Sequence, residues 1–247
     1  MKRHLLIGIH PVESALDQSA GQVHLLVVAA ESKNPRTRKL EKRARALGIR
    51  IESRPRATLD RDSDGQRHQD VMAEFEVNNL YDEQDLESVL EKMNAPKLVL
   101  VLDGVQDPHN LGACLRTADA AGVGLVILPK DGSAGLTPVA RRSAAGAAEV
   151  MPLLLATNLA RVLRKLKEQG VWLAGTADDA AQDIYQADLT GPLALVMGSE
   201  GKGMRRLTSE LCDFLVRIPM QGSVSSLNVS VATAVCLFES NRQRALK

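Results

Sequence analysis

Short apolar runs alternate with amphipathic segments from residue 97 to the end of the chain. Each run has the length of a buried strand, and the segments between them repeat apolar residues at helical spacing. The predicted strands are 98–102, 125–128, 151–155, 171–174, 193–197 and 214–218. The predicted helices are 110–121, 137–147, 158–169, 204–212 and 227–240. This alternation predicts an α/β fold in which helices cover both faces of a parallel sheet.

The last of these helices carries apolar residues on more than one face. Val231 and Phe238 recur on one side, whereas Val229 and Cys236 lie on the other. We therefore expect this helix to be buried on most sides, with a polar tail over residues 241–247.

The first 76 residues follow a separate α/β pattern. Its predicted strands are 5–7, 23–29, 49–51 and 71–75, and its predicted helices are 13–18 and 36–47. His68 falls in a polar, turn-prone stretch. A catalytic role is one interpretation, and we favour instead a residue that contacts a ligand backbone or hydrogen-bonds its own turn. The composition turns acidic over residues 77–96, which predicts a linker between an N-terminal domain at 1–76 and a C-terminal domain at 97–247.

Composition narrows the class of protein. Of the 247 residues, 45% are hydrophobic and 25% are charged, as in ordinary globular proteins. No apolar run reaches the roughly 18 residues of a membrane span, and the N-terminus lacks a secretory signal, so we expect a cytoplasmic protein without a membrane segment. The three cysteines have no CxxC spacing, which indicates reduced core thiols and no metal site.

Charge is distributed unevenly, although the net charge is only +1. Residues 33–56 hold ten Lys and Arg against two acidic residues. A basic helix within such a stretch either has a solvated charged face or offers a surface that binds a polyanion, and the high charge density favours polyanion binding. Aromatic residues make up 2% of the chain, which disfavours single-strand binding by stacked aromatic side chains.

Two loops that follow predicted strands carry candidate chemistry. In the first, Asp107 or Asn110 is suited to cap the next helix, and Arg116 lies off that helix's apolar face, as a solvent-exposed residue does. In the second, three glycines within residues 198–203 surround Glu200. This order matches neither the Walker A loop nor the dinucleotide fingerprint, which disfavours a kinase or a dehydrogenase.

A third loop joins the last strand to the last helix. It contains Pro219, Gly222 and a group of serines, and it is followed by Asn228, a polar residue at the start of an apolar helix. The serines and Asn228 are suited to capping that helix. The same arrangement also suits a concave ligand site at the carboxyl edge of an α/β sheet.

Taken together, the three loops resemble the SpoU (TrmH-like) branch of the SPOUT RNA methyltransferases. The matching motifs are Asp107-Pro-His-Asn-Leu-Gly with Arg116, Met197-Gly-Ser-Glu-Gly-Lys-Gly203, and Ile218-Pro-Met220 with Ser226 to Ala232. Order and spacing agree over residues 97–247. The segments 8–12 and 64–69 resemble the ribosomal-protein-like RNA-binding domain of one subfamily, with Asp70 where that subfamily usually has glycine.

The resemblance implies a fold, a reaction and a set of partners. The C-terminal domain is expected to be a SPOUT α/β domain with a trefoil knot, and the protein is expected to be a homodimer whose site the partner subunit completes. S-adenosyl-L-methionine is the expected cofactor, and a guanosine 2′-hydroxyl in the peptidyl-transferase loop of 23S ribosomal RNA is the expected methyl acceptor. The expected cofactor-binding residues are Gly198, Ile218, Met220 and Leu227. The expected catalytic residues are Asn110, Arg116, Glu200, Ser226 and Asn228.

Arg116 is a poor general base because the guanidinium pKa lies above about 12. We expect it to grip the phosphate beside the reacting ribose and to polarise the hydroxyl, which leaves Glu200 as the carboxylate that can accept a proton. A transfer RNA methyltransferase and a non-catalytic RNA-binding or ribosome-assembly factor are the alternatives that the sequence leaves open.

Overall fold

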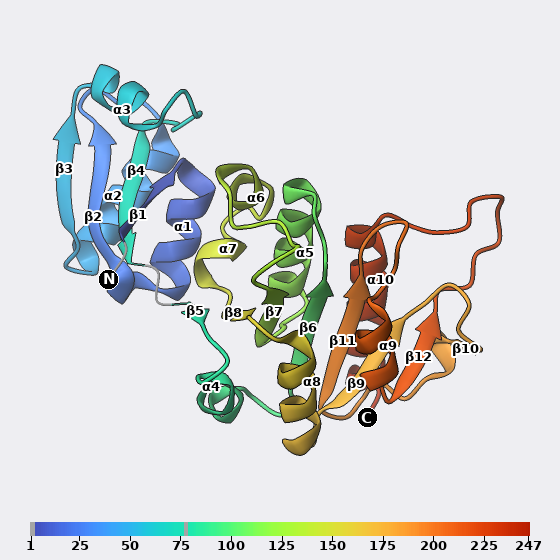
Figure 1. Ribbon diagram of the computed structural model, residues 1–247. Helices are drawn as coiled ribbons and strands as arrows, with labels where there is room; N and C mark the ends of the chain where they lie inside the picture. The colour runs from blue at the N-terminus through green and yellow to red at the C-terminus, as the bar shows by residue number, and fades with distance from the viewer. Residues whose placement is uncertain (1–2, 77–78) are drawn as a thin grey trace. The chain divides into compact units, whose positions relative to one another are not determined.

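The computed structural model describes residues 3–76 and 79–247 (Figure 1). The chain divides into two compact units, one of residues 1–79 with 145–150 and the other of residues 80–144 with 151–247. Among the described residues, no helix is long and apolar enough to cross a membrane.

The N-terminal unit is a four-stranded mixed sheet with helices packed on it. Its elements are β1 (Arg3–Ile7), α1 (Ile9–Gln18), the 3-10 helix η1 (Ala20–Gln22), β2 (Val23–Ala29), α2 (Pro35–Ala46), β3 (Arg50–Arg54), α3 (Arg56–Asp62), β4 (Val71–Glu76) and α7 (Ala147–Val150). The strand order is β1-β4-β2-β3, with β2 and β3 parallel and the other pairs antiparallel. Alternate residues of β2 enter two separate apolar clusters, so each face of the sheet is covered.

The C-terminal unit contains an eight-stranded parallel sheet. Its elements are β5 (Leu80–Tyr81), α4 (Leu86–Lys92), β6 (Leu98–Asp103), α5 (Pro108–Ala120), β7 (Leu125–Pro129), α6 (Pro138–Ser143), β8 (Leu153–Ala156), α8 (Leu159–Glu168), β9 (Trp172–Thr176), β10 (Gln182–Asp183), the 3-10 helix η2 (Ile184–Gln186), β11 (Leu193–Gly198), α9 (Arg206–Leu211), β12 (Phe214–Arg217) and α10 (Val229–Ala245). The strand order is β10-β12-β9-β11-β6-β7-β8-β5. The predicted α/β class is confirmed, and the trefoil knot stays a prediction.

Two helical layers cover this sheet, as the alternation predicted. Val99 and Val101 of β6 pack with α4 and α8 in one apolar cluster. The intervening Leu100 and Leu102 are equally buried and, by strand alternation, face the other way. There α10 contacts both α5 and β11. The helix expected over 137–147 is two helices instead, because Ala145 and Gly146 between them both take positive φ angles.

Residues 80–96, which the sequence placed in a linker, pack within the C-terminal unit, whereas 77–78 lie outside the described residues. β5 pairs with β8 at the sheet edge, and α4 buries Leu86, Val89 and Leu90. Glu83 fixes this segment: it accepts hydrogen bonds from Asn158 N at 2.6 Å and Arg161 Nε at 2.7 Å. Its burial raises its pKa, but these bonds and the charge of Arg161 outweigh burial, so the pKa lies below its ordinary value.

Asp70 takes a backbone conformation that glycine adopts more readily than other residues do. Asp70 has a φ of 67°, a left-handed conformation that aspartate tolerates better than most residues do. Its Oδ2 accepts a hydrogen bond from Ser32 Oγ at 2.9 Å. His68 is buried and bonds within the same region, to Asp60 Oδ1 at 2.8 Å and to Asp70 N at 3.0 Å. The interpretation of His68 as a residue that hydrogen-bonds its own turn is confirmed.

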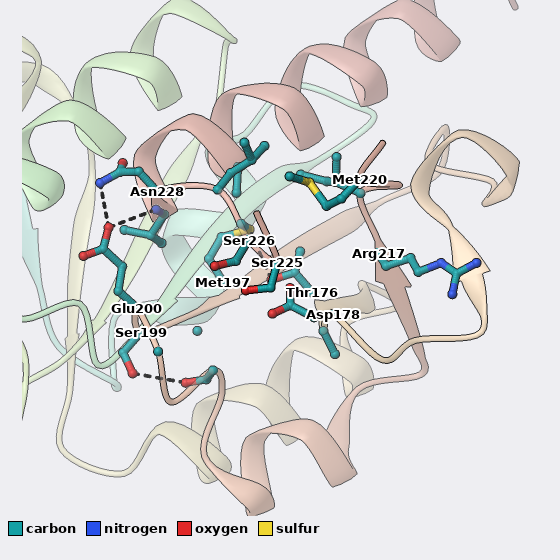
Figure 2. Close-up of a pocket in the computed structure, with 18 of the residues that line it drawn as sticks. Thr176, Asp178, Met197, Ser199, Glu200, Arg217, Met220, Ser225, Ser226 and Asn228 are labelled. Carbon is teal, nitrogen blue, oxygen red and sulfur yellow. Dashed lines mark hydrogen bonds between the residues drawn. The ribbon is translucent and has the colours of Figure 1, made fainter. Parts of the chain in front are cut away.

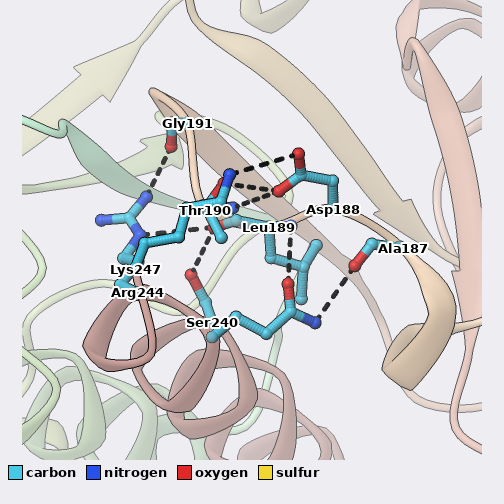
Figure 3. Close-up of polar contacts among 9 residues, drawn as sticks. Ala187, Asp188, Leu189, Thr190, Gly191, Ser240, Arg244 and Lys247 are labelled. Atoms are coloured by element: carbon cyan, nitrogen blue, oxygen red, sulfur yellow. Dashed lines mark hydrogen bonds and ion pairs between the residues drawn. The ribbon is translucent and has the colours of Figure 1, made fainter.

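The expected end of the last helix at residue 240 is wrong, because α10 continues through the polar residues to Ala245. Its last turns are tied to the loop that precedes β11 (Figure 3). Ser240 Oγ donates to Leu189 O at 3.0 Å, Gln243 Nε2 donates to Ala187 O at 3.1 Å, and Arg244 Nη2 donates to Gly191 O at 2.7 Å. Polar residues therefore extend this helix because their side chains satisfy loop carbonyls.

We expect Glu83→Gln to lower the free energy of unfolding by about 1–2 kcal/mol at pH 7, since it removes a charged hydrogen-bond acceptor. The folded-state pKa of Glu83 is depressed, so its contribution is present above the ordinary value of about 4.3 and is lost as pH falls further. Denaturant titrations from pH 7 to pH 3 should show the difference from wild type shrinking on the acid side. Glu91→Gln, on the exposed side of α4, is the matched control; a pH-independent Glu83 effect would contradict the assignment.

Candidate active site

Loops that follow β9, β11 and β12 surround a cavity of about 400 Å³ at the carboxyl edge of the sheet (Figure 2). Residues from four segments line it: 176–178, 197–203, 216–220 and 225–232. All four expected cofactor-binding residues are among them, namely Gly198, Ile218, Met220 and Leu227. Three of the expected catalytic residues line it as well, namely Glu200, Ser226 and Asn228.

The glycine loop takes its shape from close backbone contacts at the end of β11. A Cβ atom on Gly198 would lie 2.2 Å from the carbonyl carbon of Gly203, so only glycine fits there. Ser199 N donates to Gly203 O and Gly203 N donates to Ser199 O, each at 2.9 Å, which closes the loop. Glu200 therefore projects from a tight loop whose position is set by its own backbone.

Asp103 holds the end of the glycine loop in place through Arg205, a role that was not predicted from the sequence. It ends β6 opposite Gly198, and its side chain is fully buried. Its Oδ2 accepts a hydrogen bond from Arg205 N at 2.9 Å, and the Arg205 side chain lies 3.5 Å from Oδ1. A charged residue at the end of an otherwise apolar strand was the available signal.

Asn228 joins the three loops. Its Oδ1 caps α10 by accepting from Ser230 N at 2.9 Å. Its Nδ2 donates to Glu200 Oε1 at 2.6 Å (Figure 2). The same nitrogen donates to Asn110 Oδ1 at 3.0 Å. Val229 N donates to the same Glu200 oxygen at 3.3 Å. The structure thus brings together Asn110, Glu200 and Asn228, which are far apart in the sequence.

The other two expected catalytic residues stand apart from this group. Ser226 lines the cavity and is exposed. Arg116 is exposed on α5 and lines neither this cavity nor the next one described. Within the described part of the chain its guanidinium has no hydrogen bond or ion pair. Asp107, rather than Asn110, caps α5, with Oδ1 accepting from His109 N at 2.9 Å.

A second cavity, of about 240 Å³, adjoins the first. It is lined by Gly104, Val105, Gln106, Asp107, Asn110, Ser199, Glu200, Lys202 and Val229. Ser199, Glu200 and Val229 line both cavities. The hydrogen-bonded group of Asn110, Glu200 and Asn228 therefore lies where the two cavities meet.

The cysteines offer no nucleophile at this site. Cys114 is buried beside Thr233, and burial raises the pKa of its thiol to about 11. Burial raises the pKa values of Cys212 and Cys236 to about 12. Among the residues that the structure describes, no group of three or more His, Cys, Asp or Glu side chains is arranged to hold a metal ion.

A parallel sheet with a glycine loop, a helix N-terminus and paired polar side chains at its carboxyl edge defines a ligand-binding α/β protein. Residues 97–238 match the SpoU rRNA Methylase family, and residues 5–81 match a domain described as RNA 2′-O ribose methyltransferase substrate binding. The chain belongs to the SpoU rRNA methylase family.

Curated relatives cover almost the whole chain. Proteins named 23S rRNA (guanosine-2′-O-)-methyltransferase RlmB are 54% identical in Pseudomonas putida, covering 98% of this chain and 97% of the relative, and 51% identical in Photobacterium profundum, covering 100% of both. The protein of that name in Haemophilus influenzae is 54% identical and covers 97% of each chain.

Solved structures give the same grouping. The SpoU methyltransferase AviRb of Streptomyces viridochromogenes, solved in complex with the cofactor AdoMet, has a TM-score of 0.80 at 25% identity, covering 99% of this chain and 92% of its own. A TrmH/SpoU tRNA modifying enzyme from A. aeolicus has a TM-score of 0.56 at 30% identity, covering 66% of this chain and 83% of its own.

Proposed function

We propose that the protein transfers a methyl group from S-adenosylmethionine to a guanosine 2′-hydroxyl of 23S ribosomal RNA. Full-length relatives at 51–54% identity carry that activity in their names. The structural observation that carries the proposal is the bridge from Asn228 to Asn110 and Glu200 where two cavities meet. A two-substrate transfer needs such a meeting point, because positioning supplies much of its rate.

The first cavity fits the cofactor. Met197, Met220 and Leu227 provide apolar surface for an adenine ring, and the absence of a side chain at Gly198 opens the backbone of the glycine loop. Asp178 and Glu200 place negative side chains at the same cavity, which suits a ligand with a sulfonium and an ammonium group.

Bound among Gly198, Met220 and Leu227, S-adenosylmethionine would supply an electrophilic methyl group, and the ribose 2′-hydroxyl that accepts it would have to give up its proton. Glu200 is the carboxylate placed to take that proton. Its Oε1 is held by Asn228 Nδ2 and Val229 N. Asn228 and Val229 thus fix the carboxylate in orientation, and Asn110 accepts from the amide of Asn228, so Glu200 meets the hydroxyl without rearranging.

Arg116 enters this scheme as the residue that grips phosphate beside the reacting ribose. Its planar fork suits a phosphate, and its exposed guanidinium is free to bind one. Because Arg116 lines neither of the two cavities described above, we assign it to the site of a partner subunit in a homodimer.

The exposed face of α10 supports that dimer. Val231 is 49% exposed and Phe238 is 50% exposed, although this helix was expected to be buried on most sides. They lie seven residues apart and so share one face of the helix. A second copy of the chain would cover this apolar face, which the protein's own fold leaves open.

The basic helix α2 supports ribosomal RNA as the substrate. Arg36 and Arg45 pair with Glu13 and Glu41, but Arg38 and Lys42 are exposed and have no ion-pair partner in the described parts of the chain. Free cations on one helix suit phosphate contacts. The solved tRNA modifying enzyme covers 66% of this chain, whereas the relatives named for 23S ribosomal RNA cover 97–100% of it, which favours ribosomal over transfer RNA. A ribosomal substrate supports a cytoplasmic location for the activity.

Gly198→Ala tests cofactor and activity together. Its Cβ would displace the glycine loop, so we expect affinity for S-adenosylhomocysteine to fall at least about tenfold, with methyl transfer to 23S ribosomal RNA falling as well. Gly191→Ala is the matched control, because its Cβ meets no atom within 4 Å. Calorimetry and incorporation of labelled methyl measure the two effects. Wild-type protein that binds S-adenosylhomocysteine but methylates no RNA would instead support the non-catalytic factor.

Mixed dimers test the assignment of Arg116. Arg116→Ala and Glu200→Ala should each be nearly inactive as pure proteins. If Arg116 serves the partner's site, a re-equilibrated equal mixture contains hybrid dimers with one intact site and recovers about a quarter of wild-type activity. A mixture as inactive as its components would place Arg116 in the site of its own chain, and a fully active Arg116→Ala protein would place it outside the reaction.

A further inference from the structure

We infer that the second cavity receives the acceptor guanosine, that Asp107 reads the guanine base, and that Lys202 holds a neighbouring phosphate. This inference rests on the proposed methyl transfer and names the site of its second substrate.

The second cavity lies beside the cavity that fits the cofactor. It shares Ser199, Glu200 and Val229 with the cavity that fits the cofactor, and it also contains Asn110. An acceptor hydroxyl must approach the methyl group from a space that adjoins the donor site at the reacting atoms. Of the cavities described, the one of about 240 Å³ meets this requirement at Glu200.

Glu200 and Asn110 have polar atoms at the junction of the two cavities that bond to no other described residue. Glu200 uses Oε1 for its bonds to Asn228 and Val229, which leaves Oε2 without a hydrogen bond among the described residues. Asn110 accepts through Oδ1, and its amide nitrogen donates to no other described residue. One free acceptor and one free donor therefore remain at the junction, as a ribose hydroxyl that gives up its proton requires.

Asp107 gives the second cavity a preference for guanine over adenine. Its Oδ1 is used in capping α5, whereas its Oδ2 makes no hydrogen bond within the described chain, and the side chain is exposed. The Watson–Crick edge of guanine presents an N1–H and an amino group, both donors, and a flipped base is read on that edge. Adenine presents an acceptor at N1. A free carboxylate oxygen therefore favours guanine.

Lys202 completes the site. Lys202 belongs to the glycine loop and lines the second cavity. It is exposed, and its ammonium group has no ion-pair partner among the described residues. A lysine is a mobile point charge and suits a phosphate whose position varies during entry. The cavity thus offers an acceptor for the base, a donor–acceptor pair for the ribose and a cation for the backbone.

The test compares two synthetic RNA hairpins that carry guanosine or inosine at the methylated position. Inosine lacks the amino group but keeps N1–H and O6. We expect wild-type kcat/KM to be about tenfold or more higher for guanosine, the effect of one charge-assisted hydrogen bond. Asp107→Asn keeps the helix cap but presents a donor to the amino group, so it should lose this preference. Both proteins should bind S-adenosylhomocysteine equally in calorimetry.

Lys202→Ala tests the phosphate contact separately. It should lower RNA affinity and reduce the slope of log affinity against log salt by about one, while leaving the preference for guanosine unchanged. Lys92→Ala, an exposed lysine on α4, should change neither quantity.

Equal wild-type rates on guanosine and inosine, or an unchanged preference in Asp107→Asn, would overturn the assignment of Asp107 while leaving the methyltransferase intact. An unchanged salt slope in Lys202→Ala would remove Lys202 from the site. Wild-type protein that binds S-adenosylhomocysteine but methylates neither hairpin would refute the proposed function itself, and the acceptor site with it.

Discussion

The arrangement of the site depends on the hydrogen bonds that the side-chain amide of Asn228 makes. Its oxygen caps α10, and its nitrogen holds Asn110 and Glu200 together. Each hydrogen bond to a charged group contributes about 1.5–3 kcal/mol, enough to keep Glu200 in one orientation although its loop is exposed. Because one amide serves both purposes, the start of the helix and the geometry of the site cannot vary independently.

The rest of the C-terminal unit holds the two sides of this contact in place. Asp103 and the closed backbone of the glycine loop position Glu200 at the end of β11. At its other end, α10 is tied by Ser240 and Arg244 to the loop that precedes β11. The helix and the strand are therefore fixed to each other at both ends, which keeps Asn228 opposite Glu200.

Local patterns were sufficient to predict much of this arrangement. Apolar runs located the six longer strands of the C-terminal sheet, and the motif residues around Gly198 and Leu227 line one cavity. Other features depend on contacts between distant residues that periodicity does not record. The packing of residues 80–96 depends on Glu83 meeting α8, and the second cavity forms only where the Asp107 loop adjoins the glycine loop. The exposure of Phe238 was also not predicted. The apolar pattern of a helix does not show whether the protein's own fold covers each apolar side chain.

We propose that Glu200, held by Asn228, brings a cofactor and a ribosomal ribose together. Mapping of 2′-O-methylated nucleotides in total RNA tests it most directly, in cells that lack the protein and in cells that regain it as wild type or as Glu200→Ala. We expect one guanosine of 23S ribosomal RNA to lose its methyl group without the protein, to recover it with wild type, and to stay unmodified with Glu200→Ala. Full restoration by Glu200→Ala, or an unchanged map in cells without the protein, would contradict it.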